Sequence, residues 1–388
     1  MRIIYYDLIA PKGIHASFNA GLINVLYEWQ NRNNDITVHF HSEESHGNIV
    51  SRILRNENIY IILKPCKILI KSIVGGWKTP LRDILGIYYV ITAFISRHKH
   101  NEEILVFGLV YPFSLKAINF CSQLLKKKVF VCLHGEMSVF VNKVNFHRNK
   151  KYFSLMKNDL IKENKYIKYI VLGEPIYDVI RHVFLNKPII INLPYIFNNK
   201  NIINNNFEPL IVGQIGNGDK GKGTHYLFEI ARIMKKEIIE NKIRFILVGK
   251  LSNELQSLDE GLVEYRKEIV EQDVFESMIQ RLHFSLQLRD SSTAQATASA
   301  TFIDTLKFDK PFLSLNNNYI NYYLSQENLQ KYAFNSIDDI IGYLKRFIDL
   351  NDKEKIYNYN IMLSDIQKLK NYFSIKHNAK LLSNQYIH

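Results

Sequence analysis

Short runs of apolar residues, each bounded by polar or turn-forming residues, recur through the first two hundred positions. The runs typical of strands are Arg2–Tyr6, Ile36–Phe40, Ile59–Leu63, Ile104–Phe107, Val129–Leu133, Ile167–Leu172 and Ile189–Leu193. Between them, apolar residues recur at helical spacing, for example over Phe18–Trp29 and Leu115–Leu125. This alternation of short strands and helices predicts an α/β domain whose parallel sheet is covered on both faces.

A polar, asparagine-rich stretch, Phe197–Pro209, separates this series from a second one. Because 388 residues exceed what one core comfortably holds, we expect two domains joined by this linker. The first domain is predicted over residues 1–200 and the second over residues 208–350. The remaining segment, residues 351–388, is predicted to be helical.

A glycine-rich loop follows the first strand of the second series, Leu210–Val212. Its glycines are Gly213, Gly216, Gly218, Gly221 and Gly223. A helix is predicted from Thr224, with apolar residues at helical spacing as far as Ile238. Glycines let backbone N–H groups turn toward an anion, and a helix N-terminus favours negative charge. Lys220 and Lys222 lie in this loop and could bind a diphosphate; the alternative is a surface loop with solvated lysines.

A second candidate anion site lies at Ser299, Ala300 and Thr301, which precede a predicted helix. Small residues at a helix start allow close approach of a phosphate, and hydroxyls add hydrogen-bond donors. Asp304, one turn later, could accept hydrogen bonds from ribose hydroxyls. The alternative is an ordinary N-cap followed by a first-turn acid. Pro311 then opens a predicted strand, Phe312–Leu315.

The order of these blocks resembles the C-terminal domain of GT-B glycosyltransferases, particularly those of family 4. The matching segments are PLIVGQIGNGDKGKGTHYL, RFILVGK and SATFIDTLKFDKPFLSL, and they lie within residues 208–320. The resemblance implies two Rossmann-like, doubly wound domains that face a central cleft. It also implies that the N-terminal domain binds the acceptor, that the C-terminal domain binds a nucleotide sugar, and that the last helical segment crosses back to the first domain.

Residue by residue, the resemblance places Lys222 at the diphosphate and Asp304 at the second, ribose-binding acid. The sequence departs from the family at two positions: Gln214 replaces the phosphate-binding arginine, and Ala296 replaces the first glutamate. Both retaining and inverting chemistry therefore stay open. Two alternatives also stay open, namely a UDP-sugar 2-epimerase of the same fold and a non-catalytic nucleotide-binding scaffold.

Ligands of open parallel sheets bind beyond the carboxyl ends of the strands, where three loops of the first domain contain polar residues, the last of them at Leu172–Glu174. The first loop contains Gly13 and His15 and resembles the acceptor-facing loop of GT-B enzymes. The second follows Val129–Leu133 and contains His134, which matches a histidine at the donor sugar, and Glu136, which could deprotonate an acceptor hydroxyl. The alternatives are a helix-start acid and a partly buried histidine bonded to backbone.

The formal net charge of +13 adds a candidate surface. Between Lys64 and Lys99 there are seven Lys or Arg residues against one acid, Asp83, and aromatic residues are interleaved among them. This composition over residues 64–100 is typical of segments that bind an anionic membrane surface. A solvated basic face is the alternative, and no nucleic-acid-binding motif supports a nucleic-acid partner.

Other features of the sequence limit the expected cellular location and cofactor requirements of the protein. We find no apolar run of about 18 residues, no signal peptide and no metal-ligand spacing, and Cys66, Cys121 and Cys132 are isolated. The expected protein is cytoplasmic, lies on the inner face of the cytoplasmic membrane, and needs no metal or cofactor beyond its nucleotide-diphosphate sugar. The expected reaction is hexosyl transfer to a glycan or lipid-linked acceptor in the synthesis of a bacterial capsule, O-antigen or lipopolysaccharide.

Overall fold

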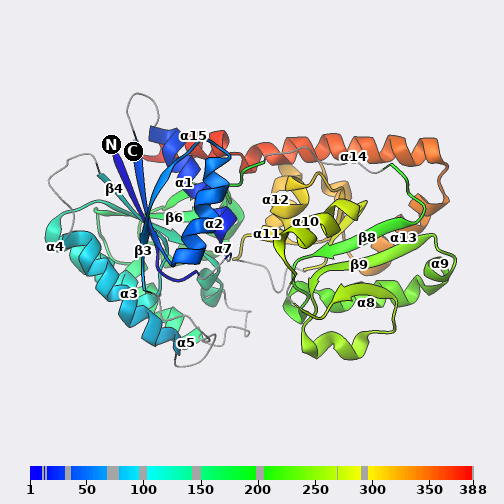
Figure 1. Ribbon diagram of the computed structural model, residues 1–388, viewed down its shortest axis with the longest axis horizontal. Helices are drawn as coiled ribbons and strands as arrows, with labels where there is room; N and C mark the ends of the chain where they lie inside the picture. The colour runs from blue at the N-terminus through cyan, green and yellow to red at the C-terminus, as the bar shows by residue number, and fades with distance from the viewer. Residues whose placement is uncertain are drawn as a thin grey trace. The chain divides into compact units, whose positions relative to one another are not determined.

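The chain forms two compact units in the computed structural model (Figure 1). The structure describes residues 1–10, 13, 15–30, 36–67, 78–95, 103–141, 150–197, 205–268, 270–289 and 296–386. Unit 1 comprises Met1–Ile196, Ala296–Ala298 and Phe373–His388, and unit 2 comprises Phe197–Gln295 and Ser299–Tyr372. Most of the predicted linker and part of the basic segment 64–100 therefore lie outside the described residues.

Unit 1 is built on a seven-stranded parallel sheet of order β3-β2-β1-β4-β5-β6-β7. Its strands are β1 (Arg2–Asp7), β2 (Thr37–Ser42), β3 (Ile61–Pro65), β4 (Glu103–Leu109), β5 (Val129–Leu133), β6 (Ile167–Leu172) and β7 (Ile189–Ile191). All five residues of β5 are buried, as expected for a central strand covered on both faces.

Helices cover this sheet in two groups (Figure 1). The first group is α1 (Ala16–Gln30), α2 (Glu44–Arg55) and α15 (Ile375–Tyr386). The second includes α3 (Lys78–Ile95) and α4 (Pro112–Leu125), which pack against each other. Shorter helices are α5 (Lys150–Phe153), α6 (Lys157–Leu160), α7 (Glu174–Ile180) and a 3₁₀ helix, Gly135–Phe140.

Unit 2 contains a six-stranded parallel sheet of order β10-β9-β8-β11-β12-β13. Its strands are β8 (Leu210–Ile215), β9 (Ile243–Lys250), β10 (Val263–Arg266), β11 (Phe284–Gln287), β12 (Phe312–Leu315) and β13 (Ala333–Phe334). Its helices are α8 (Thr224–Ile233), α9 (Lys235–Ile239), α10 (Gln272–Arg281), α11 (Ala300–Lys307), α12 (Asn318–Gln326), α13 (Ile337–Asp349) and α14 (Asp352–Phe373).

Both sheets reverse their strand order at one point, between β1 and β4 in unit 1 and between β8 and β11 in unit 2. This is the doubly wound arrangement of Rossmann-like folds, so the predicted α/β class with two such domains is confirmed. The loops after these strands diverge at the reversal and leave a crevice at the carboxyl edge. The predicted glycine-rich loop follows β8, directly at the reversal of unit 2.

The C-terminal segment forms two consecutive helices that belong to different units. Within unit 2, Tyr359 of α14 is buried and packs edge-on against Phe284 of β11. In unit 1, α15 packs against α1 and β7, and the Gln385 amide donates to the carbonyl oxygen of Ile190 at 2.8 Å. Among the described residues, no helix is both long enough and apolar enough to span a bilayer.

Several predicted boundaries shift by a few residues. The strand expected at Ile59–Leu63 is β3, Ile61–Pro65, because Ile59 instead closes a turn by donating its N–H to Leu54 at 3.0 Å. The helix expected to run from Thr224 to Ile238 is broken at Met234, whose φ of −94° and ψ of 22° end α8 before α9 begins. Met234 itself is buried, but no residue of α9 is, so the apolar spacing predicted one helix where the structure has two.

Candidate functional site

The loop between β8 and α8 is organised by Asp219 and closed by a left-handed glycine. The Asp219 carboxylate accepts from the backbone N–H of Lys222 at 2.9 Å, and its carbonyl accepts from Thr224 at 3.2 Å. Gly223 adopts a φ of +71° immediately before α8. A Cβ at this position would lie 2.1 Å from the carbonyl oxygen of Leu288, just after β11, so only glycine fits.

Three glycines of this loop use their backbone N–H groups in hydrogen bonds within the protein, so those groups do not face an anion. Gly216 donates to Val248 at 2.8 Å, Gly218 to Lys250 at 2.9 Å and Gly223 to Lys220 at 3.1 Å. The expectation that these glycines turn their N–H groups toward an anion is therefore wrong for these three. An anion at this edge would instead meet side chains and the first turns of α8 and α11, where N–H groups lack intrahelical acceptors.

Lys222, Gly216 and Thr301 converge on one point beside this loop. A Cβ built on Gly216 would lie 2.9 Å from Thr301 Cγ2 and 3.7 Å from Lys222 Nζ. Lys222 is half-buried, and its ammonium donates to the carbonyl oxygen of Asn217 at 2.9 Å. Burial lowers the pKa of Lys222, and the nearby Asp219 carboxylate opposes this change. Lys220, by contrast, is exposed.

The start of α11 contributes hydroxyls to the same edge. Ser299 is its N-cap, and its Oγ accepts from the N–H of Phe302 at 3.2 Å. Ser299 Oγ and Thr301 Oγ1 lie 3.2 Å apart, and Ala300 is the first residue of the helix. Asp304 is half-buried one turn along, while Ala296 is buried. Ser299 therefore has the expected N-cap role, and the methyl group of Thr301 is the part of this residue that lies beside Gly216.

A pair of glycines tests how tightly this loop must pack. Gly223→Ala and Gly261→Ala place alanine at nearly equal left-handed φ values, +71° and +74°, but only Gly223 is crowded, since nothing lies within 4 Å of a Cβ at Gly261. We expect Gly261→Ala to lower the free energy of unfolding by about 1–2 kcal/mol. Gly223→Ala should cost about 1–3 kcal/mol more, because Leu288 must move. Urea unfolding of both variants measures the difference, and equal losses would contradict this packing.

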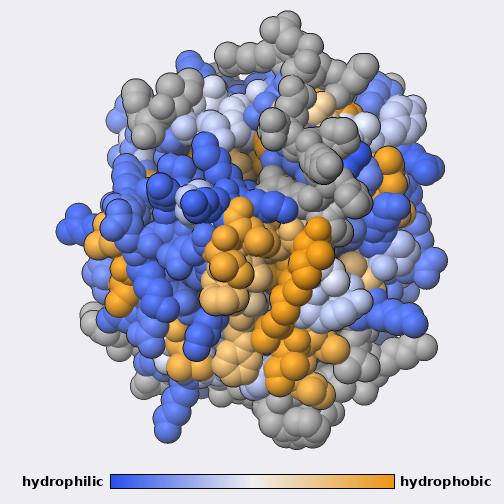
Figure 2. All heavy atoms as spheres, turned by 90° about the vertical axis from the view of Figure 1, so that its left-hand side faces the viewer, coloured by the Kyte–Doolittle hydropathy of each residue, from blue (hydrophilic) through white to orange (hydrophobic). Residues whose placement is uncertain are grey.

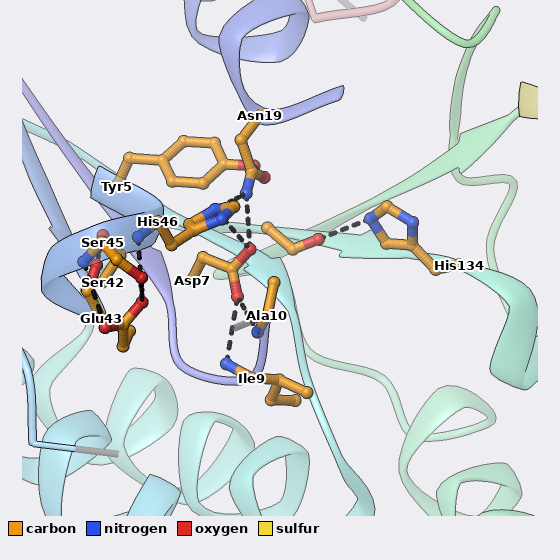
Figure 3. Close-up of polar contacts among 11 residues, drawn as sticks. Tyr5, Asp7, Ile9, Ala10, Asn19, Ser42, Glu43, Ser45, His46 and His134 are labelled. Carbon is orange, nitrogen blue, oxygen red and sulfur yellow. Dashed lines mark hydrogen bonds and ion pairs between the residues drawn. The ribbon is translucent and has the colours of Figure 1, made fainter. Parts of the chain in front are cut away.

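In unit 1, a buried polar network holds the loop that follows β1 (Figure 3). Asp7 ends β1 and is fully buried; its Oδ1 accepts from the N–H groups of Ile9 and Ala10 at 3.0 and 2.9 Å. Its Oδ2 accepts from Asn19 of α1, whose amide also lies 2.8 Å from Nε2 of the buried His46 on α2. These contacts hold Ile9 and Ala10, the residues just after β1; Gly13 and His15, further along, are both exposed.

His134, immediately after β5, lies at the same edge of this sheet. Its Nε2 is 2.7 Å from the carbonyl oxygen of Gly108 in β4 (Figure 3). Because a carbonyl can only accept, Nε2 must bear the proton, which leaves Nδ1 as an acceptor. Burial, and to a lesser extent the ring of His15, whose centroid is 5.2 Å away, lower the pKa of His134 to about 3. His134 is thus a neutral hydrogen-bonding group at pH 7 and a weak base.

Glu136 is 7% exposed in the 3₁₀ helix that follows His134. Burial raises its pKa to about 7, although its Oε1 accepts from the N–H of His134 at 2.8 Å, which opposes the change. The hydrogen bond is the local one expected of a helix-start acid. The raised pKa is the property of a base that exchanges protons near neutrality. The two roles are compatible, since Oε1 makes the hydrogen bond and Oε2 is the second oxygen of the same carboxylate.

Two sets of residues at these edges were not predicted from the sequence. The first is the Asp7–Asn19–His46 network, whose only signal is an acid at the end of an apolar strand. The second is Arg289, two residues after β11, whose Nε donates to the carbonyl oxygen of Gly221 at 3.2 Å. Within the described ranges, no three His, Cys, Asp or Glu side chains are grouped closely enough to hold a metal ion.

Comparisons with known proteins place this geometry in a known fold. Neither a protein-family model nor a curated protein sequence matches the chain. Among solved structures, Anabaena HepE in complex with UDP-glucose is 13% identical, with a TM-score of 0.62 and all of both chains covered. TarM is 12% identical with a TM-score of 0.64, covering 100% of this chain and 98% of its own.

A Thermobaculum terrenum O-GlcNAc transferase mutant is also similar, at 12% identity and a TM-score of 0.54. That comparison covers 100% of this chain and 66% of the transferase. These proteins are glycosyltransferases with the GT-B fold, so the chain has a divergent GT-B fold.

Proposed function

We propose that this chain is a glycosyltransferase that moves a sugar from a nucleotide-diphosphate donor to a hydroxyl acceptor. The observation that supports it most is the convergence of Lys222, Gly216 and Thr301 at the strand-order reversal of unit 2. A cation and a helix start at this edge suit a diphosphate. The similar HepE structure holds UDP-glucose, which agrees with a sugar nucleotide as the ligand class.

In the proposed reaction, the bond between the sugar and the diphosphate breaks and negative charge develops on the leaving phosphate. The Lys222 ammonium and the N-terminal turn of α11 would offset this charge, a form of electrostatic preorganisation. Gly216, Gly223, Ser299 and Ala300 would line the same site, and Lys220 adds an exposed positive charge to the loop. Asp304 would accept from ribose hydroxyls. The proposed chemistry requires no metal ion, because these groups neutralise the diphosphate.

On unit 1 we assign Glu136 as the base that removes the acceptor proton, if the reaction inverts the anomeric centre. His134, which burial keeps neutral and whose Nε2–H is donated to Gly108, would accept a hydrogen bond from a sugar hydroxyl through Nδ1 and would not act as a base. Gly13 and His15, further along the chain after β1, are assigned to the acceptor side.

A thermal-shift panel of UDP- and GDP-sugars tests the proposal, with CMP-sugars, which have a single phosphate, as the comparison. We expect one donor series to raise the melting temperature, because a ligand that binds only the native state stabilises it. Product analysis with a bound donor then separates the alternatives: an epimerase returns an isomerised nucleotide sugar, whereas a scaffold leaves the donor intact. The absence of any stabilising sugar nucleotide would refute the transferase.

We further propose that the acceptor is a glycan or lipid-linked saccharide of bacterial surface polysaccharide synthesis, used at the inner face of the cytoplasmic membrane. Support comes from a stripe of exposed apolar residues on α3, spaced by three or four positions: Leu81, Ile84, Tyr88, Ile91 and Ile95. Their side chains are 40–73% exposed. The neighbouring α4 adds Phe120 and Leu124, 66% and 65% exposed.

Figure 2 shows the resulting apolar area on this face of unit 1, beside hydrophilic residues. Two exposed lysines lie on or beside these helices in the described chain: Lys116 is on α4, and the carbonyl oxygen of Lys67 accepts from Tyr89 of α3 at 3.0 Å. Isolated exposed apolar residues are ordinary, but a row along one helix marks an interaction site. Apolar side chains flanked by lysines suit the headgroup region of an anionic bilayer.

Vesicle binding tests this assignment. Ile84→Glu with Tyr88→Glu should reduce co-sedimentation with phosphatidylglycerol-containing vesicles by about tenfold or more, because two inserted side chains are lost. Ile239→Glu is the matched control, since Ile239 is a 72% exposed residue of α9 in unit 2. Wild-type binding should rise with anionic lipid and fall with salt. Equal binding to neutral vesicles, or none at low salt, would contradict it.

A further inference from the structure

Arg289 is an unexplained cation at the proposed diphosphate edge. It follows β11, which pairs with β8, so it lies at the same edge of the sheet as the glycine-rich loop. Its Nε donates to the carbonyl oxygen of Gly221 at 3.2 Å, which holds the guanidinium against the loop. One of its five N–H donors is used in this bond, and the guanidinium nitrogens Nη1 and Nη2 retain the others.

The charges around Arg289 are unbalanced. Asp219 interacts with both Arg289 and Lys222, and its Oδ2 lies 3.9 Å from Lys222 Nζ. Burial lowers the pKa of Arg289, and the presence of Arg289 adds to the lowering of the pKa of Lys222. Among the described residues, these two partly buried cations interact with one carboxylate, that of Asp219. Such an arrangement is costly without an anionic ligand, because partial burial weakens solvation of both charges.

Position 214 holds a neutral glutamine, so a second cation at this edge must come from another residue. Gln214 stands where related GT-B proteins have an arginine, but here its amide donates to the carbonyl oxygen of Lys222 at 2.8 Å. The residue is 5% exposed, and its Oε1 is buried without a partner among the described residues. Gln214 therefore supports the backbone of the loop and provides no positive charge.

We infer that Arg289 supplies the second cation of the diphosphate site, in place of the arginine that Gln214 replaces. This inference rests on the proposed function, since it assigns a further binding residue to the same donor. A guanidinium pairs with two phosphate oxygens at once, which a lysine ammonium does not. Lys222 and Arg289, on loops from adjacent strands, would then bind the diphosphate from two directions.

Calorimetric titration of the full chain with UDP, GDP, uridine and guanosine tests this inference. Arg289→Gln should weaken binding of the preferred diphosphate by about 10- to 100-fold and leave the affinity for the matching nucleoside unchanged. Arg289→Lys should recover part of the lost affinity, because lysine keeps the positive charge but does not pair with two phosphate oxygens at once. The control is Arg232→Gln, which removes an exposed arginine of α8 and should bind as the wild type does.

The outcomes separate this inference from the proposed function. If Arg289→Gln binds the diphosphate as tightly as the wild type while Lys222→Ala is weakened, the second cation is misassigned and the transferase proposal stands. An equal loss for diphosphate and nucleoside would assign Arg289 to the base or to loop structure, and would also overturn the inference. A wild-type chain that binds neither UDP nor GDP would overturn both.

Discussion

Glu136→Gln should lower kcat by about 10²- to 10⁴-fold if the enzyme inverts the anomeric centre, with little change in donor affinity. The substitution preserves the shape of a buried side chain and removes its basicity. Because the folded-state pKa is raised to about 7, the wild-type base is charged above pH 7 and protonated below it. Wild-type kcat should therefore rise through pH 7 and level off above it, and this rise should be absent from the variant.

Steady-state kinetics between pH 5.5 and 8.5 measure both effects, with Glu163→Gln as the control, since Glu163 is an exposed carboxylate elsewhere in unit 1. Linkage predicts a second readout. A carboxyl whose folded-state pKa is raised favours folding at low pH, and this contribution is lost as pH rises through about 7. Glu136→Gln should thus stabilise the fold more at pH 8 than at pH 5.5. Near-normal turnover with retained anomeric configuration would refute the base assignment and favour the family 4 mechanism.

Lys222→Ala should weaken donor binding by about 1.5–3 kcal/mol, which is about a 10- to 150-fold increase in Kd. The loss follows from removing a charge-assisted hydrogen bond to the diphosphate. The loop backbone should persist, because Asp219 holds it through the N–H of residue 222, and not through the lysine side chain.

Calorimetry with the stabilising nucleotide sugar measures this change. Lys236→Ala provides the control, as Lys236 is an 82% exposed lysine on α9 of the same unit. Unchanged donor affinity in Lys222→Ala, together with an unchanged melting temperature, would show that the diphosphate site is misplaced. An affinity loss in both variants would indicate a diffuse electrostatic effect of net charge.

The strands with a clear local apolar pattern could be predicted from the sequence. The strands Val129–Leu133, Ile167–Leu172 and Phe312–Leu315 have the predicted bounds, because each is a short apolar run ended by polar or turn residues. The sheet order and the helix break at Met234 were not predictable in this way. Strand order depends on contacts between distant segments, and Met234 is a good helix former whose backbone is set by its surroundings.

The candidate site also combines features that local sequence predicts with features that only the fold brings together. The glycine-rich loop and the helix start at Ser299 follow from local sequence, since glycine and N-cap preferences act over a few residues. Arg289 and Gly221 are 68 positions apart, and Asn19 and His46 are 27 apart. The first contact exists because parallel pairing brings two loops to one edge, and the second because α1 and α2 pack against each other. The role of Gly216 as a point of close approach to Thr301 likewise required the folded geometry.

The account depends most on a diphosphate bound where the strand order of unit 2 reverses. A crystal structure of the chain with the nucleotide sugar that most raises its melting temperature tests this directly. We predict phosphate oxygens about 3 Å from Lys222 Nζ and from N–H groups in the first turn of α11, with the nucleotide beside Asp304. A diphosphate bound to the opposite edge of the sheet, or to unit 1, would contradict the account.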